Sequence, residues 1–168
     1  MSILASSDFT GQFGLAQSNT TDFSWYFERY EREYLVKLLG ADLYGLFYAD
    51  LGGDPETPTE DKYVTIFEPL TFDDGKPYVS HGIKFILKCF VFYHFIKDNN
   101  LYHSIAGLVS NNVENAVAQI ETKGAQYITT RYQEALESFE AIQVYIQNNL
   151  SDYPDFNGVE IQRSPVFW

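Results

Sequence analysis

The chain has 168 residues, of which 45% are hydrophobic and 17% aromatic, and its formal net charge at pH 7 is -12. This length is enough for one domain with a real core and too short for two domains of ordinary size. The acidic charge argues against binding to the phosphates of duplex DNA, which needs clustered Lys and Arg, and against docking on anionic lipid. It leaves open that DNA passes beside the protein without being held.

The cysteine content and the lengths of the apolar runs argue against a disulfide-linked, secreted or membrane-spanning protein. Cys89 is the single cysteine, which excludes a disulfide within the chain, and we expect it to be a small buried residue. The N-terminus has neither a basic flank nor a long apolar run, so it does not resemble a signal peptide. The apolar run at 85–96 is shorter than the roughly 20 residues that span a bilayer. We therefore expect a protein made in the cytosol, without a membrane partner.

Residues 1–21 are rich in Ser, Thr, Gln, Gly and Asn, and neither a helical nor a strand period persists there. The interpretation is an N-terminal arm, and its simplest alternative is a floppy terminus. Phe9, Phe13 and Leu15 are spaced along it and indicate a segment that docks, with a neighbouring subunit as one possible surface.

Two helices are predicted after the arm. The first begins at the capping residues near 22 and ends at Gly40, a residue suited to a left-handed C-cap. Its apolar residues recur at spacings of three and four: Phe23, Tyr26, Phe27, Tyr30, Tyr34 and Leu38. Asp42 starts the second helix. The apolar side of that helix is predicted to hold Leu43, Leu46, Phe47 and Leu51.

Residues 52–78 form an irregular insertion punctuated by four prolines. The run Tyr63–Phe67 is compatible with a short helix or a short strand, and the acidic residues before it slightly favour the helix. Asp73, Asp74 and Gly75 predict a turn. A cation site at these aspartates is the weaker alternative, because the full spacing of a calcium loop is absent.

The most apolar segment of the chain predicts a central helix, roughly 80–98, capped by Ser80. Such a helix must be covered on several sides, and we expect the helix before Gly40 and the last helix to cover it. Lys84 and Lys88 mark its polar line, which is predicted to face water or acidic neighbours.

Residues 99–124 predict a polar connector that is irregular up to about Asn112. The last long helix is predicted at about 125–149, although it could begin near Asn112 with a break at Gly124. Its apolar residues alternate steps of four and three, as in a coiled-coil seam: Ile128, Tyr132, Ala135, Phe139, Ile142 and Ile146.

The fold class that follows is all-α: a small bundle of about four to five helices with extended N- and C-terminal arms and the insertion near 52–78. We divide the chain into an N-terminal arm (1–21), a helical domain (22–150) and a C-terminal arm (151–168). Large apolar residues on the two arms are candidates for a subunit or partner interface. They are Phe9, Phe13, Leu15, Phe156, Val159, Ile161, Val166, Phe167 and Trp168.

Catalytic and metal-binding motifs are not found in the sequence. His81, His94 and His103 do not have the spacing of a helical zinc motif, and no phosphate-binding or nucleophile-elbow motif is present. We therefore predict no catalytic residue, no metal and no cofactor. An enzyme would need a pocket that gathers Glu114 with His94 or His103.

Two segments resemble a known family when taken together. Residues 26–44 read YFERYEREYLVKLLGADLY, and residues 82–98 are followed at 107–116 by GLVSNNVENA. These helix junctions resemble those of head–tail connector, or head-completion, proteins of tailed phages. They are closest in pattern to the neck and ring proteins of crAss-like and other Bacteroidetes phages. The resemblance covers roughly residues 22–150, leaves out 52–78, and carries no catalytic signature.

The resemblance implies a structural virion protein that assembles in the host cytoplasm into a ring at the phage neck. Such a ring lies between the portal protein and the tail or further neck proteins, commonly with twelvefold symmetry. It would extend the DNA channel without binding DNA specifically. The alternative is a monomeric helical adaptor or regulatory binding module without catalytic activity, in which both arms fold back on the same chain.

Overall fold

The computed structural model describes residues 2–10, 13, 24–53, 56–99, 101–104, 107–110 and 117–159. Within these residues the protein is a small helical bundle of five α-helices, with a 3-10 turn near the start and two short β-hairpins. The predicted all-α bundle is therefore confirmed, and the two hairpins are additions to it.

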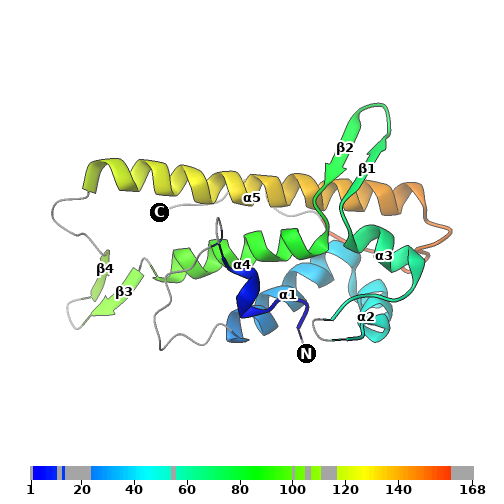
Figure 1. Cartoon of the computed structure of the whole chain (residues 1–168), viewed down its shortest axis with the longest axis horizontal. Coiled ribbons are helices and arrows are strands. Elements are labelled where there is room, and N and C mark those ends of the chain that lie inside the picture. Colours follow the sequence, from blue (N-terminus) through cyan, green and yellow to red (C-terminus); the bar gives the residue numbers. More distant parts are fainter. Residues whose placement is uncertain are drawn as a thin grey trace.

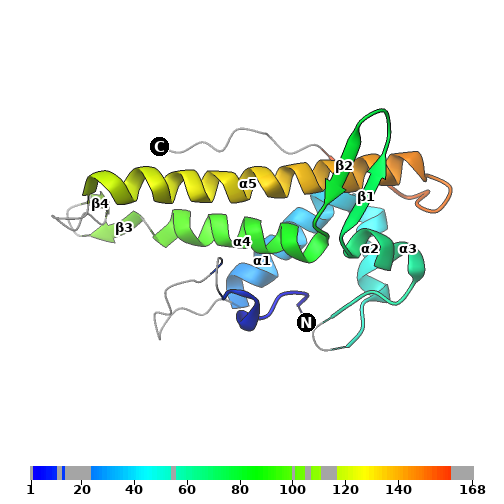
Figure 2. The same cartoon turned by 45° about the horizontal axis from the view of Figure 1, so that its top comes forward.

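Three long helices form the body of the molecule: α1 (Ser24–Leu39), α4 (Ile83–Asn99) and α5 (Val117–Asn148). In Figures 1 and 2, α5 runs along the long axis, α4 lies beside it, and α1 packs on α4 from the other side. The central position predicted for the apolar segment is therefore confirmed. Helix α4 lies between the two helices that were expected to cover it.

Aromatic side chains hold α4 in this position. The ring of Phe90 stacks on Tyr34 of α1 at a centroid distance of 3.8 Å. It also forms T-shaped pairs with Tyr132 and Phe139 of α5, with ring centroids 5.4 and 6.5 Å apart. Phe90 is fully buried, as are Cys89 and Val91 beside it. One aromatic residue thus joins all three long helices.

The seam predicted for the last helix faces this core. Tyr132, Ala135, Phe139, Ile142 and Ile146 are buried, and Ile128 packs against them. The helix begins at Val117 and continues through Gly124, so the predicted start near 125 and the break at Gly124 were wrong. A glycine in a helix interior costs about 1 kcal/mol relative to alanine, which a helix of this length tolerates.

Two glycines allow sharp turns of the chain just before helices α2 and α4. Gly40, with φ of 84°, separates α1 from α2 (Ala41–Asp50), so a positive-φ glycine at this junction is confirmed. Gly82, also at 84°, precedes α4 and lies against the backbone of Phe67. Ser80 accepts a hydrogen bond from the Gly82 backbone N–H, although the helix itself starts only at Ile83.

The insertion at 52–78 is more ordered than its prolines suggested. Tyr63–Phe67 belong to α3 (Asp61–Phe67), which confirms the helical interpretation. Strands β1 (Leu70–Asp73) and β2 (Pro77–Ser80) pair antiparallel, with Asp73 and Asp74 exposed at the turn. In Figure 1 this hairpin projects beyond α5. The Phe72 ring anchors the hairpin on Tyr145 of α5, with the two ring centroids 5.5 Å apart.

A second hairpin joins α4 to α5 at the other end of the bundle (Figure 1). Strands β3 (Leu101–Ser104) and β4 (Gly107–Ser110) pair antiparallel, so the prediction of irregular structure up to Asn112 was wrong. Asn pairs and glycine are turn residues, but here Gly107 is the first residue of β4, and each strand is only four residues long. No helix in the described part of the chain is long and apolar enough to cross a membrane.

Candidate functional site

The N-terminal arm packs against its own chain where the structure describes it. Phe9 is buried and stacks on Phe27 of α1, with ring centroids 5.3 Å apart. Phe13 is 2% exposed and meets Phe85 and Phe92 of α4 edge-on. These two candidate interface residues therefore belong to the core of the single chain.

The arm also covers the polar line of α4. Lys84 forms an ion pair with Asp8 at 3.0 Å, and the Lys88 ammonium lies 5.1 Å from the centre of the Phe13 ring. The acidic neighbour expected for this line is thus a residue of the arm itself. Because both lysines are engaged by the arm, this side of α4 does not form a basic surface.

The start of the C-terminal arm also returns to the bundle. The Val159 backbone N–H donates to the Lys37 carbonyl at 2.8 Å, and the Gln143 side-chain amide donates to the carbonyls of Lys37, Leu38 and Val159. Gly158 lies so close to Leu38 that a Cβ there would stand 2.3 Å from the Leu38 oxygen. The chain is therefore tied to the end of α1 up to residue 159.

The other predicted interface residues differ in placement. Phe156 is partly buried against the core, whereas the side chain of Val159 is 55% exposed. Leu15, Ile161, Val166, Phe167 and Trp168 lie outside the described residues.

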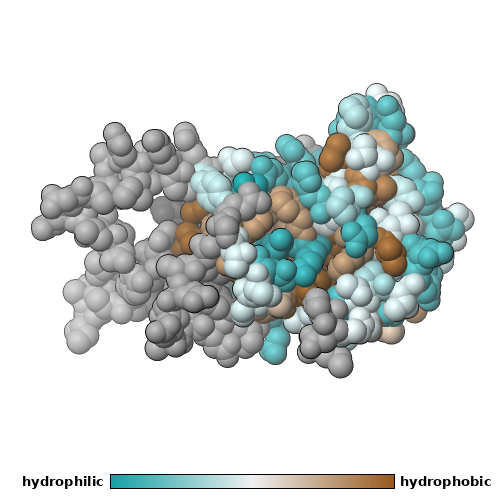
Figure 3. All heavy atoms as spheres, viewed as in Figure 1, coloured by the Kyte–Doolittle hydropathy of each residue, from teal (hydrophilic) through white to brown (hydrophobic). Residues whose placement is uncertain are grey.

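Several exposed hydrophobic residues were not predicted as interface candidates. Between 46% and 51% of each is exposed: Trp25, Leu46, Tyr48, Val79 and Leu150. On the face shown in Figure 3, hydrophobic residues appear as separate spots among hydrophilic ones. The assignment of Leu46 to the buried side of its helix was wrong, because Leu46 is 49% exposed, whereas Leu43 and Phe47 are buried and Leu51 packs against the core. Trp25 carried a usable signal, since it falls outside the apolar stripe of α1.

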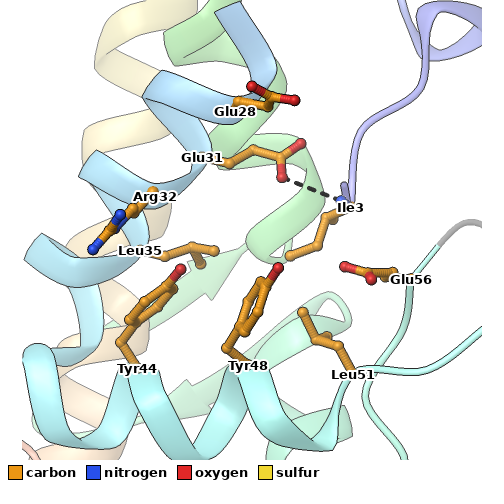
Figure 4. A pocket seen from close by; sticks show the side chains of 9 residues that line it. All are labelled: Ile3, Glu28, Glu31, Arg32, Leu35, Tyr44, Tyr48, Leu51 and Glu56. Atoms are coloured by element: carbon orange, nitrogen blue, oxygen red, sulfur yellow. Dashed lines mark hydrogen bonds between the residues drawn. The ribbon is translucent and has the colours of Figure 1, made fainter. Parts of the chain in front are cut away.

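A cavity of about 470 Å³ opens between α1, α2, the first residues of the arm and the segment after α2. Its size is within the range of small-ligand sites. We call it the Glu56 cavity. It is lined by Ile3, Glu28, Glu31, Arg32, Leu35, Tyr44, Tyr48, Leu51 and Glu56 (Figure 4).

Glu31 forms one wall of the Glu56 cavity and fastens the arm to it. Its carboxylate accepts hydrogen bonds from the Ser2 hydroxyl and from the backbone N–H groups of Ile3 and Leu4. Burial raises the pKa of this carboxyl above its ordinary value, while the three hydrogen bonds act in the opposite direction. The arm thus closes the side of the cavity at which Ile3 lies.

Glu56 forms the opposite wall, and only 6% of it is exposed. Its Oε2 atom is buried and has no hydrogen-bond partner in the part of the chain that the structure describes. Figure 4 shows its carboxylate pointing toward the ring of Tyr48, whereas the Arg32 guanidinium lies on the far side of the cavity. An orphaned buried carboxylate oxygen costs free energy unless a donor meets it.

His94 is part of the core and not of this cavity. Its ring stacks on Tyr30 at 3.9 Å, and a hydrogen bond of 2.8 Å joins its Nε2 to the Tyr34 hydroxyl. Burial lowers the pKa of His94 to about 4. Glu114 lies outside the described residues, so the grouping that an enzyme would need is not observed. No group of three or more metal-type ligands occurs among the described residues.

Comparisons with protein-family models, with curated proteins and with solved structures found no match to this chain. The function must therefore be inferred from the sequence pattern and the geometry of the chain itself. Two features of that geometry are not needed to complete the core of the chain. They are the exposed hydrophobic residues on separate elements and the Glu56 cavity.

Proposed function

We propose that this protein is a non-catalytic structural subunit that assembles head to tail into a ring at the neck of a tailed phage, between portal and tail. The proposal unites the pattern of helix junctions with one structural observation. Exposed hydrophobic side chains occupy separate elements: Val79 on hairpin β1–β2 and Leu46 on α2.

A closed ring of identical subunits needs two different surfaces on each subunit that complement one another. The projecting hairpin supplies one such surface. Thr71 and Val79 are cross-strand partners, and both side chains are exposed. The side of α2 that carries Leu46 supplies the other, because Leu46 is 49% exposed and points away from the core. We assign the ring contact to these two surfaces, the hairpin surface and the α2 surface.

The charge of the chain fits a channel through which DNA moves. A net charge of -12 repels the phosphate backbone, so a ring of such subunits would not hold DNA by phosphate neutralisation. The ring would guide DNA without recognising its sequence.

Static light scattering over a wide protein concentration range, after size-exclusion chromatography, tests the assembly. The ring proposal predicts a mass that rises with concentration toward a closed oligomer, with twelve copies as the expected number. A strict monomer at the highest concentration would count against it.

Paired variants test whether the contact is head to tail. Val79→Asp removes the hairpin surface and Leu46→Asp removes the α2 surface, so each variant alone should stay monomeric. Mixed in equal amounts, they retain one intact pair of surfaces and should give a dimer that does not grow further. Leu150→Asp, which places the same charge on a residue exposed to a similar extent outside both surfaces, should still form rings. Rings formed by either of the first two variants would contradict the assignment.

A second function, a monomeric helical adaptor, is favoured by a different observation. The described parts of both arms fold back on the same chain, through the Phe9 and Phe13 contacts and through the Val159 backbone. An adaptor would remain monomeric in the scattering experiment and in the presence of a portal ring.

A further inference from the structure

The Glu56 cavity combines features that the ring contact does not use. Three carboxylates line it, from Glu28, Glu31 and Glu56, and the rings of Tyr44 and Tyr48 lie on its floor (Figure 4). The carboxylate of Glu31 is already engaged by the arm, and Glu28 is exposed to water. The buried Oε2 of Glu56 is therefore the acceptor that remains to be satisfied.

A hydrogen-bond donor that carries positive charge would satisfy this oxygen best. A neutral donor would leave a buried carboxylate without a counter-charge, which costs more than an unmade hydrogen bond. A metal ion fits poorly, because no group of three or more metal-type ligands exists among the described residues. An organic cation needs fewer anionic contacts than a metal ion does.

The tyrosine rings that line the cavity favour a planar organic cation over other cations. The rings of Tyr44 and Tyr48 lie 5.7 Å apart, and Tyr48 is 46% exposed, so its ring is accessible from solvent. A guanidinium group is planar, so it can stack on a tyrosine ring while it donates two parallel hydrogen bonds to a carboxylate. The chain already uses the stacking contact elsewhere, because the Arg29 guanidinium lies over the rings of Trp25 and Tyr30.

We infer that the Glu56 cavity is a binding site for a guanidinium group, with the Glu56 carboxylate as the anionic partner and the Tyr48 ring as the stacking surface. The group would come from an arginine side chain of a partner protein or from a free guanidinium compound. This inference does not depend on ring assembly, since the cavity lies within one chain.

Isothermal titration with L-argininamide tests the inference directly on the full chain. We expect saturable binding to the wild type that is weakened about tenfold or more in Glu56→Gln, which keeps the shape of the side chain and removes its charge. Glu137→Gln removes one exposed carboxylate of α5 and should bind like the wild type. Tyr48→Leu, which removes the stacking ring, should weaken binding severalfold.

Three related probes define the specificity. Citrullinamide has the shape of argininamide without its charge, and lysinamide has the charge without the planar group. Both should bind at least about tenfold more weakly than argininamide. A short peptide with one arginine separates the two sources, because binding tighter than that of argininamide indicates a protein partner and equal binding indicates a free compound.

Several results would overturn the inference. These are equal binding of citrullinamide, equal binding of lysinamide, no saturable binding, or unchanged affinity in Glu56→Gln. An experimental structure in which Arg32 of the same chain bonds to Glu56 would also overturn it, because the site would then be filled from within. Thermal melting separates a loss of binding from a loss of folding in Glu56→Gln. Argininamide should raise the Tm of the wild type and of Glu137→Gln, and it should leave the Tm of a folded Glu56→Gln variant unchanged.

Discussion

Glu31 shows how one buried carboxylate fixes the arm to the bundle. Its three hydrogen bonds come from successive residues of the arm, so they hold the backbone of the arm and not only a side chain. Charge-assisted hydrogen bonds of this kind are worth more than neutral ones, and removing the acceptor leaves two backbone donors unpaired.

Glu31→Ala should therefore lower the free energy of unfolding by about 2 kcal/mol, measured by urea denaturation. The amides of Ile3 and Leu4 should exchange faster with deuterium in this variant. Glu28→Ala, one turn earlier and exposed, is the control and should change stability by less than about 0.5 kcal/mol. Equal stability of the two variants would show that the arm is held by its aromatic residues alone.

His94 makes the stability of the fold depend on pH. Burial lowers the pKa of His94 from 6.5 to about 4 in the folded chain, while the negative charges of Glu33 and Asp98 oppose this shift. The unfolded chain therefore takes up the proton at a higher pH than the folded chain. The stabilising contribution is complete above about pH 6.5 and is lost as the pH falls from there toward 4.

The free energy of unfolding of the wild type, relative to that of His94→Gln, should fall by about 2 kcal/mol between pH 7 and pH 4, after allowance for the partial exposure of the ring. Glu31 acts with the opposite sign, because a carboxyl whose pKa is raised on folding stabilises the fold as the pH falls. The comparison with His94→Gln removes this contribution, since both proteins contain Glu31. A difference that stays constant over this range would contradict the assigned shift.

The elements depend on particular glycines as much as on apolar patterns. Gly82 turns the chain from β2 into α4 at a φ of 84°, and a Cβ there would lie 2.5 Å from the Phe67 carbonyl oxygen. Gly45 is the opposite case: it lies inside α2, and an added Cβ would meet nothing within 4 Å.

Gly82→Ala should therefore destabilise the protein by about 3 kcal/mol through backbone strain and steric overlap. Gly45→Ala should stabilise it by about 0.5–1 kcal/mol, because alanine favours the helix. Thermal melting of the two variants measures both effects. A Gly82→Ala variant that melts no lower than the wild type would contradict the strain assigned to this turn, and a Gly45→Ala variant that melts lower would contradict the open space assigned to that helix position.

Periodicity was sufficient to predict the long helices. The stripe from Tyr26 to Leu38 and the seam from Tyr132 to Ile146 both face the core, because an apolar face leaves a helix few other orientations.

The two hairpins could not be predicted from the sequence, for a physical reason. Strands of four residues leave little alternation to read, so turn residues dominate the signal at 70–80 and 101–110.

The Glu56 cavity could not be predicted at all from sequence. Its walls come from four segments that only the fold brings together, and Glu56 lies in the proline-rich insertion, where no period marks a residue as buried. The N-terminal arm was partly predictable. Its apolar spacing indicated docking, but whether Phe9 and Phe13 pack on their own chain or on a neighbour depends on where α1 and α4 leave space.

At the level of the whole molecule, a hairpin projects from one end of an elongated bundle, a second hairpin joins α4 and α5 at the other end, and α2 lies beside the end of α1 (Figures 1 and 2). The core is closed by aromatic contacts, so the exposed residues Val79 and Leu46 are not needed to complete it. Surfaces that the fold does not need are the ones available for assembly, which is why we place the ring contacts there.

Electron microscopy of the portal ring of the tailed phage that we propose as the source of this chain, imaged with and without the purified protein, tests the central claim most directly. The neck-ring account predicts an additional ring at the tail-facing end of the portal, with the portal's symmetry, which is absent when Val79→Asp replaces the wild type. A portal that remains bare in the presence of excess wild-type protein would contradict it.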